Sequence, residues 1–347
     1  MFSPFYNGRP VLVSNQAAEM NGGGPQEVRA LWYVAPGQAE IRGERLAPPG
    51  DGEVRVRTRF SALSRGTEAL VLTGRVPESE YRRMRAPMMS GDFPFPVKYG
   101  YAAVGTVEAG PADLIGRDVF VLHPHQTCFN APAPMAVLLP EDVPPQRAVL
   151  AANMETALNA VWDIAPGPAD RIAVVGAGVV GALVAYLCGT MAGAQVTLID
   201  IREERRDLAR ALGVGFALPE DAAGDCDAVF HTSASAAGLA TALRLAGDEA
   251  SVCEMSWYGA GEVTAALGGA FHARRLRLIS SQVGQVAASH RPRWSHRRRL
   301  GAALALLNDA RLDALLAPAI RFDDVPARIS DVLDPARGTL CQPIAYP

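Results

Sequence analysis

Cysteine and lysine are scarce in this chain of 347 residues. The five cysteines are scattered and odd in number, and none forms a C-x-x-C pair. This pattern predicts reduced thiols and a cytoplasmic location, because a disulfide framework uses an even number of cysteines at regular spacings. Lys98 is the only lysine, so the chain offers a single candidate for a Schiff base.

Long apolar runs and a strong excess of charge are also missing. No stretch is long enough to span a bilayer, and no basic start precedes an apolar core of the signal-peptide type. The net charge is only −3 and is spread along the chain, which argues against nucleic acid or a membrane as partner. A hydrophobic content of 49% is ordinary for a folded soluble protein, and the length suggests two domains.

The pattern of residues divides the chain into four parts. Residues 1–27 show little periodicity and are predicted to form a loosely attached extension. Residues 28–150 contain short alternating strands such as EVRVRTRF, which predict a β-rich domain of barrel or sandwich type. Residues 151–290 alternate strands with helices, the βαβ rhythm of a doubly wound sheet. Residues 291–347 return to short strands.

The most informative stretch is RIAVVGAGVVGALVAYLCGTMAGAQVTLID, residues 171–200. It predicts a buried strand, a tight turn, a helix and a second strand that ends in an acid. Gly176, Gly178 and Gly181 fit the pattern G-x-G-x-x-G. The first glycine allows the turn, the second lets the backbone approach a pyrophosphate, and the third lets the helix pack on the strand.

The rest of this stretch agrees with a dinucleotide site. The free N–H groups of Val179 and Val180 open the helix, where the helix dipole favours an anion. Asp200 lies 22 residues after Gly178, where a carboxylate can accept a hydrogen bond from a ribose. A glycine-rich turn in some other α/β protein is the alternative, and it leaves Asp200 unexplained.

Residues that follow the second strand bear on the choice of dinucleotide. Asp200 favours NAD, because a carboxylate repels the 2′-phosphate of NADP. Arg202, Arg205 and Arg206 follow closely, however, and an arginine nearby is what NADP binding needs. We expect NAD on the strength of the acid, and NADP stays possible.

Two later segments are predicted to end strands of the same sheet. They are HTSAS, residues 231–235, and SWYG, residues 256–259. A doubly wound sheet binds its ligand at this edge, so we expect Thr232 and Ser233 to contact the nicotinamide through their backbone. For His231 simple packing is the alternative.

The order of these parts resembles the medium-chain dehydrogenase/reductase superfamily from about Val28 onward. LSRGTE (63–68) resembles the segment with the first catalytic-zinc ligand of its alcohol dehydrogenases, and GYAAVGTVEAG (100–110) resembles their glycine-histidine-glutamate motif. METALNA (154–160) resembles the segment that enters the cofactor domain. The resemblance implies an α/β fold with a doubly wound Rossmann cofactor domain and a β-rich GroES-like catalytic domain. It also implies an oxidoreductase that acts on a small-molecule substrate as a homodimer.

The departures from the superfamily concern zinc. The cysteine ligand is replaced by Ser64 or Arg65, the histidine by Tyr101, and the following glutamate by Ala102. These side chains are not the thiolate, imidazole or carboxylate that zinc needs. Cys128 stands alone where a structural-zinc lobe would carry four cysteines. We therefore predict that both zinc sites are absent.

A zinc-less branch that resembles the bacteriochlorophyllide hydroxyethyl dehydrogenases shares the pattern of Ser64, Gly66, Thr67 and Glu68. This likeness implies interconversion of a secondary alcohol and a ketone on a ring-bearing substrate, which it does not identify.

Without zinc, another group must hold and protonate the developing alkoxide. Tyr101 is either this donor or a filler of the old metal cavity. Ser64 and Thr67 either orient the substrate or form a turn. Glu155, in AANMETALNA, is either a buried proton relay or a first-turn glutamate favoured by the helix dipole.

VLHPHQTC places His123 and His125 near Cys128 after a strand. A replacement metal site, a proton relay or substrate contact, and structural hydrogen bonding are all open for these histidines. The basic run RPRWSHRRRL (291–300) is open between anion binding and a solvated helix start or subunit contact.

Three functions follow from these observations. The preferred one is a zinc-independent alcohol/carbonyl oxidoreductase that uses NAD. The second is an NADPH-dependent enone or quinone reductase. The third is a dinucleotide-binding protein that has lost catalysis.

Overall fold

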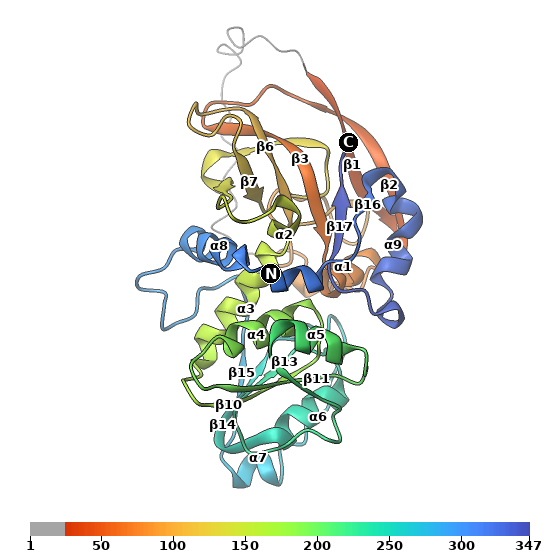
Figure 1. Ribbon diagram of the computed structural model, residues 1–347. Coiled ribbons are helices and arrows are strands. Elements are labelled where there is room, and N and C mark those ends of the chain that lie inside the picture. The colour runs from red at the N-terminus through yellow and green to blue at the C-terminus, as the bar shows by residue number, and fades with distance from the viewer. Residues whose placement is uncertain (1–24) are drawn as a thin grey trace. The chain divides into compact units, whose positions relative to one another are not determined.

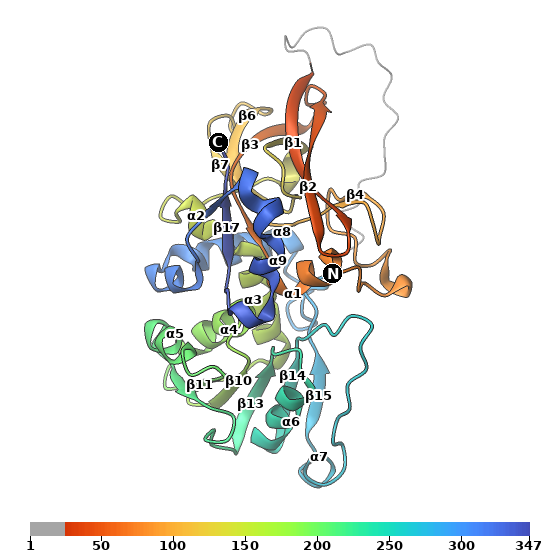
Figure 2. The ribbon, with the colours of Figure 1, turned by 90° about the vertical axis from the view of Figure 1, so that its right-hand side faces the viewer.

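A computed structural model describes residues 25–347, so most of the expected N-terminal extension lies outside the described residues (Figures 1 and 2). The chain forms two units. The β-rich unit takes the chain up to Ala152 and the segment Ala317–Pro347, and the α/β unit takes Asn153–Leu316. Residues 291–316, which the sequence analysis placed in the C-terminal return, pack within the α/β unit. Each unit is described by itself.

The β-rich unit contains two sheets. The smaller has the order β2-β1-β5-β4, and the larger has the order β16-β17-β3-β6-β7-β9 with β8 paired to β3. The strands of the smaller sheet are β1 (Gln26–Ala35), β2 (Gln38–Leu46), β4 (Ser90–Gly91) and β5 (Val97–Lys98). Those of the larger are β3 (Glu53–Leu63), β6 (Ala103–Ala109), β7 (Asp118–Val121), β8 (Cys128–Pro132), β9 (Val137–Leu138), β16 (Ile320–Arg321) and β17 (Gln342–Ala345).

Strand β3 shows why this sequence forms the sheet. In EVRVRTRF the small apolar or polar residues Val54, Val56 and Thr58 are buried, while the arginines between them face outward. This is the two-residue period of a strand with one covered face. Val54 and Val56 pack into a core with residues of β6, β7 and β8, such as Phe129.

The helices of the β-rich unit are short. They are α1 (Arg65–Leu72), α2 (Pro145–Ala148) and α9 (Val325–Leu333), with 3₁₀ turns at Glu78–Glu80, Ala133–Met135, Phe322–Asp324 and Pro335–Arg337. Helix α1 begins directly after β3, at the N-cap Ser64. Helix α3 (Ala151–Ile164) begins in the β-rich unit and continues into the α/β unit.

The α/β unit is built on one parallel sheet of six strands in the order β12-β11-β10-β13-β14-β15. The strands are β10 (Arg171–Val175), β11 (Gln195–Ile199), β12 (Gly215–Ala217), β13 (Cys226–His231), β14 (Ala246–Glu254) and β15 (Arg277–Ser280). The helices are α4 (Val179–Gly189), α5 (Arg205–Leu212), α6 (Ala236–Leu245), α7 (Ala270–Ala273) and α8 (His296–Ala305), with 3₁₀ turns at Leu306–Asn308 and Ala310–Leu315.

The strand order fixes where a ligand can bind in this unit. After β10 the chain builds β11 and β12 on one side, and then returns to place β13 on the other side of β10. Helices α4 and α5 lie on one face of the sheet and α6 on the other (Figures 1 and 2). The carboxyl ends of β10 and β13 are therefore a topological switch point, which is where such sheets bind ligands. The predicted α/β fold, with a doubly wound sheet and a separate β-rich part, is confirmed.

None of the helices within residues 25–347 is long and apolar enough to cross a membrane.

Candidate functional site

The glycine turn after β10 is shaped by two close approaches. Gly176 has a φ of +109°, and a Cβ there would lie 2.8 Å from the backbone nitrogen of Ser233. A Cβ at Gly181 would lie 1.9 Å from the carbonyl oxygen of Gly176. Only glycine fits at either position, because any side chain would force strand, helix and loop apart. The turn and the helix contact that the sequence analysis assigned to these two glycines are therefore present.

Gly178 is different, because no atom lies within 4 Å of where its Cβ would be. It is the N-cap residue of α4 in an extended conformation, with a φ of −75°. No side chain among the described residues caps this end of α4, so the N–H groups of Val179 and Val180 open the helix beside free space. Such a helix start is suited to an anion.

Asp200 lies directly beside this turn, at the end of β11. Its Oδ2 accepts a hydrogen bond of 2.7 Å from the backbone N–H of Ala177, and its Oδ1 accepts one of 3.0 Å from the N–H of Arg202. Each oxygen keeps a lone pair for a further donor, such as a ribose hydroxyl. The guanidinium of Arg202 pairs with Glu204 at 3.2 Å, and that of Arg206 pairs with Glu203 at 2.7 Å.

The loop after β13 lies against the glycine turn. The hydroxyl of Thr232 donates to the carbonyl oxygen of Gly176 at 2.8 Å. The hydroxyl of Ser233 is 2.8 Å from Nε2 of His231, and Nδ1 of His231 is 2.8 Å from Oε2 of Glu254. The structure thus brings the candidate cofactor-binding residues together at the carboxyl edge of β10, β11 and β13, and adds His231 and Glu254 to them.

A second polar cluster lies in the β-rich unit, around the fully buried carboxylate of Glu68. Its Oε2 accepts from the hydroxyl of Tyr33 at 2.5 Å and lies 3.0 Å from Nε2 of His125. Its Oε1 accepts from the backbone N–H of Ser64 at 2.7 Å. A buried carboxylate without such donors would be strongly unfavourable, so these three contacts are what allow Glu68 inside the protein.

The cluster extends from His125 toward the C-terminus. Nδ1 of His125 is 2.7 Å from the hydroxyl of Ser61, which is 2.8 Å from the hydroxyl of Tyr346. Gly100 has a φ of +124°, and a Cβ there would lie 2.8 Å from Nε2 of His125. The glycine before Tyr101 therefore leaves the space in which this imidazole lies.

Tyr101 is buried next to the same cluster. Its hydroxyl hydrogen-bonds with the side chains of Ser64 and Thr67. Burial, reinforced by the negative charge of Glu68, raises the pKa of Tyr101 well above that of a free tyrosine. The phenol is therefore neutral over the whole physiological range and acts as a hydrogen-bond donor. Four sequence candidates, Ser64, Thr67, Tyr101 and His125, thus lie in one cluster.

His123 does not join this cluster. Its ring stacks on that of Phe129 with centroids 3.7 Å apart, and its Nδ1 is 2.9 Å from the carbonyl oxygen of Pro124. Burial lowers the pKa of His123 to about 3. The imidazole is neutral and donates to that carbonyl, which favours structural hydrogen bonding among the three alternatives.

Glu155 lies in the α/β unit and has a partner that the sequence did not suggest. Its Oε1 accepts from Nε of Arg299, in α8, at 3.0 Å, and both side chains are buried. Arg299 also donates to the side chain of Asn159 and to the carbonyl oxygens of Val283 and Gln285. Burial raises the pKa of Glu155, and the charge of Arg299 offsets only part of that effect. Helix α8 is thereby tied to α3, a role outside both sequence alternatives.

No grouped set of metal-binding side chains is found within residues 25–347. A zinc site needs at least three ligands. Glu68 and His125 supply a carboxylate and an imidazole that already bond each other, and no group of three histidine, cysteine, aspartate or glutamate residues within residues 25–347 is arranged to hold a metal.

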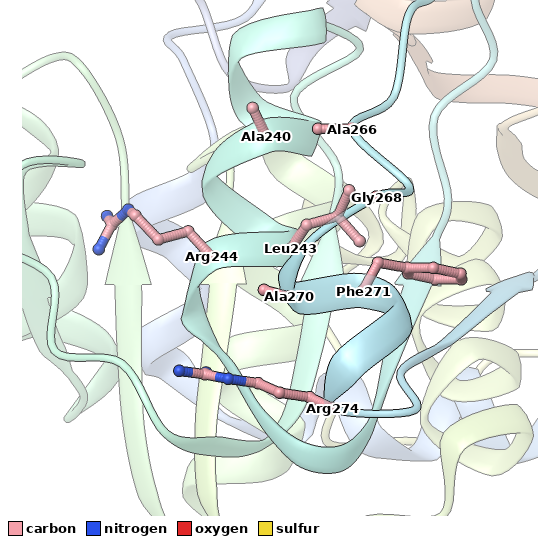
Figure 3. A pocket seen from close by; sticks show the side chains of 8 residues that line it. All are labelled: Ala240, Leu243, Arg244, Ala266, Gly268, Ala270, Phe271 and Arg274. Atoms are coloured by element: carbon pink, nitrogen blue, oxygen red, sulfur yellow. The ribbon is translucent and has the colours of Figure 1, made fainter.

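A hollow in the surface of the α/β unit lies away from the carboxyl edge of the sheet. It is lined by Leu243 and Arg244 at the C-terminal end of α6 and by Phe271 and Arg274 at α7 (Figure 3). Both guanidinium groups extend away from Phe271 in this view and donate to backbone carbonyls, Arg244 to that of Pro219 at 2.5 Å. The hollow therefore offers apolar surface and no converging polar groups.

No family model matches this chain. Solved structures do, at low sequence identity. The short chain alcohol dehydrogenase of Escherichia coli complexed with NADH is 17% identical, with a TM-score of 0.74 over 92% of this chain and 99% of its own. A Sinorhizobium meliloti protein described as a zinc-binding dehydrogenase, bound to NADP, is also 17% identical, with a TM-score of 0.74 over 92% of this chain and 99% of its own. Benzyl alcohol dehydrogenase of Acinetobacter calcoaceticus is 15% identical, with a TM-score of 0.75 over 93% of this chain and 100% of its own.

The fold is that of these dehydrogenases.

Several residues of the two clusters are not predicted from the sequence. Glu68 is recognised there only as part of a shared pattern, and Tyr33, Ser61 and Glu254 are not recognised as site residues. A signal was available for Glu68, since it is an acid followed by the apolar run ALVL. Glu254 offered none, because its partner His231 is 23 residues away on another strand.

We expect Glu68→Ala to destabilise the protein by about 3–5 kcal/mol, because it leaves the groups that bond the carboxylate buried without an acceptor. The free energy of unfolding in urea measures this. The control is Glu40→Ala, which breaks the exposed pair with Arg42 and should cost under about 1 kcal/mol. Equal losses in the two variants would contradict the importance of the buried carboxylate.

Stability should also fall on the acid side because of His123. The folded-state pKa of about 3 lies below the ordinary value of 6.5, so between these values the unfolded chain binds a proton that the folded chain does not. The contribution of His123 to the free energy of unfolding is fully present above pH 6.5 and declines by about 1.4 kcal/mol per pH unit below it. His123→Phe keeps a ring on Phe129 and should flatten the fall of unfolding free energy between pH 6.5 and pH 5. His272→Phe, at an exposed histidine, should leave it unchanged. If the free energy of unfolding fell equally with pH in the wild type and in His123→Phe, the neutral state of the buried His123 would be refuted.

Proposed function

We propose that the protein is an oxidoreductase that transfers a hydride between a nicotinamide dinucleotide and an alcohol or carbonyl group of a small molecule. The observation that carries this is the open space at Gly178, at the start of α4, with the fixed carboxylate of Asp200 beside it. The space suits a pyrophosphate and the carboxylate suits a ribose diol. The similar folds of the structures solved with NADH and NADP support the same interpretation.

NAD is the proposed dinucleotide. Both oxygens of Asp200 are held in place by backbone N–H groups, so the negative charge stays where a 2′-phosphate would lie. The nearby Arg202 and Arg206 have glutamate partners. This arrangement favours a free ribose over a phosphorylated one, although the similar Sinorhizobium meliloti protein binds NADP.

Gly178→Val tests the cofactor site. Valine fits the extended backbone and the empty space of the free protein, so we expect an unchanged melting temperature. Its side chain fills the space assigned to the pyrophosphate, so the Kd for NADH should rise at least ten-fold, about 1.4 kcal/mol. Fluorescence titration with NADH measures the Kd.

The matched control is Gly43→Val, at an exposed strand glycine whose Cβ also meets nothing within 4 Å. This variant should bind NADH as the wild type does. Unchanged NADH affinity in Gly178→Val, or no NADH binding by the wild type, would refute the proposed site.

The chemistry is proposed to run without zinc, with Tyr101 as the donor to the substrate oxygen. The cofactor supplies or accepts the hydride when bound. Tyr101 is neutral, and its hydroxyl is oriented by Ser64 and Thr67, so it can donate a hydrogen bond to a developing alkoxide. Glu68 fixes the start of α1, and with it Ser64, by accepting from the Ser64 N–H.

Tyr101→Phe tests this assignment on a panel of primary and secondary alcohols that includes benzyl alcohol, with NAD. We expect kcat to fall by about 10²–10³-fold and the Kd for NADH to stay the same, because only the donor to the reacting oxygen is lost. Dialysis against a chelator should leave the wild-type activity intact. Stoichiometric zinc whose removal abolishes turnover would overturn zinc independence.

The other two functions appear as different outcomes of the same assays. Tighter binding of NADPH than of NADH, with turnover of enones or quinones, would favour the reductase. Cofactor binding without turnover of alcohols, ketones or enones would favour a protein that has lost catalysis.

The proposal also includes the expected type of substrate, the zinc-less branch, the oligomeric state and the cellular location. A ring-bearing substrate and membership of the zinc-less branch rest on the pattern of Ser64, Gly66, Thr67 and Glu68 alone. A homodimer is supported by β15, which ends the order of the six-stranded sheet and exposes 38% of Leu278. A cytoplasmic location is supported by the five free, buried cysteines.

A further inference from the structure

Three side chains form a continuous hydrogen-bonded chain at the carboxyl edge of the parallel sheet. His231 and Glu254 are the last residues of the neighbouring strands β13 and β14. Nδ1 of His231 lies 2.8 Å from Oε2 of Glu254, and Nε2 lies 2.8 Å from the hydroxyl of Ser233. The imidazole is fully buried, so both of its nitrogens depend on these partners.

The charge on Glu254 makes it the acceptor in its bond with His231. Oε1 of Glu254 accepts from the N–H of Ser256 at 2.8 Å, and Oε2 accepts from the hydroxyl of Tyr258 at 3.1 Å. Burial would raise the pKa of Glu254, but the hydrogen bonds from His231 and Ser256 outweigh that effect and lower the pKa. An ionised Glu254 accepts from the N–H at Nδ1 of His231, and Nε2 of the same ring is hydrogen-bonded to the Ser233 hydroxyl.

The loop that Ser233 belongs to is strained and tied on several sides. Ala234 has a φ of +52°, in the left-handed region that residues other than glycine rarely adopt. Its N–H donates to the hydroxyl of Ser256 at 3.1 Å. Thr232 donates to the carbonyl oxygen of Gly176, and Ser235 caps α6 by accepting from the N–H of Gly238 at 3.0 Å. A strained loop persists only where its surroundings hold it, and here the holding groups include Ser233 and its imidazole partner.

The strand order shows which half of a dinucleotide would pass this loop. Asp200, at the end of β11, lies on one side of β10, and the loop after β13 lies on the other. With the pyrophosphate at Gly178 and the adenosine ribose at Asp200, the remaining half of the molecule extends over the ends of β13 and β14.

We propose that the His231–Glu254 pair is a positioning device that holds the loop Thr232–Ser235 against the nicotinamide half of the cofactor. The proposal rests on the proposed dinucleotide function. It assigns His231 and Glu254 no contact with the reacting atoms. They act through Ser233, which fixes the loop. Loss of the pair should therefore weaken the binding of the nicotinamide half and spare the adenosine half.

The test compares NADH with ADP, which carries the adenosine and both phosphates but lacks the nicotinamide half. For His231→Leu we expect the Kd for NADH to rise about ten-fold or more and the Kd for ADP to stay within about two-fold. Ser233→Ala and Glu254→Gln should show the same selectivity with a smaller effect, and they carry the test if His231→Leu does not fold. His272→Leu, at an exposed histidine on α7 of the same unit, is the control and should change neither Kd.

The outcomes distinguish the positioning role of the His231–Glu254 pair from the proposed dinucleotide function. A wild type that binds neither NADH nor ADP refutes the dinucleotide function, and the inference with it. A wild type that binds both, with variants that lose both affinities equally, shows a general role in folding and refutes the inference alone. Variants that lose neither affinity refute it as well.

Discussion

A carboxylate shielded from water requires donors for its oxygens, and each unit of this protein contains one that is well supplied with them: Glu68 is fully buried and Glu254 is partly buried. In the β-rich unit Glu68 accepts from Tyr33, from His125 and from the backbone of Ser64. In the α/β unit Glu254 accepts from His231, Tyr258 and the backbone of Ser256. In both, one of the donors is an imidazole whose second nitrogen meets a serine hydroxyl. Because desolvation makes an unsatisfied carboxylate so unfavourable, each acid fixes the segments that supply its donors.

This constraint explains how hydrogen bonds join distant segments of the β-rich unit. A metal would join segments distant in sequence through its ligands. Here Glu68 joins β1 through Tyr33 and the segment before β8 through His125, which is 57 residues away. Ser61 carries the connection on to Tyr346, 285 residues from it in the chain. Hydrogen bonds thus connect the segments around Tyr101, and their partners are oxygen and nitrogen atoms already satisfied by each other.

Features formed by residues close together in the sequence could be predicted, whereas contacts between residues far apart in the sequence could not. The glycine turn was predictable because Gly176, Gly178 and Gly181 act within one strand-turn-helix unit, and Asp200 follows at a fixed spacing. The doubly wound sheet followed from the alternation of strands and helices. The pair of Glu155 and Arg299 was not predictable, because 144 residues separate its members and only the packing of α8 on α3 brings them together. The Glu68 cluster was hidden for the same reason, although its acid and its histidine were each visible as residues.

The position of Tyr101 beside Glu68 also limits the proposed chemistry. Reduction of a carbonyl needs a hydride and a proton, and the group proposed to hold the carbonyl oxygen is the phenol of Tyr101. Burial and the charge of Glu68 raise the pKa of that phenol, and each pKa unit makes release of the proton about 1.4 kcal/mol less favourable. The same environment leaves the hydrogen bond that the neutral phenol donates intact, and low polarity strengthens it. In the proposed reaction Tyr101 therefore enters as a neutral hydrogen-bond donor to the substrate oxygen.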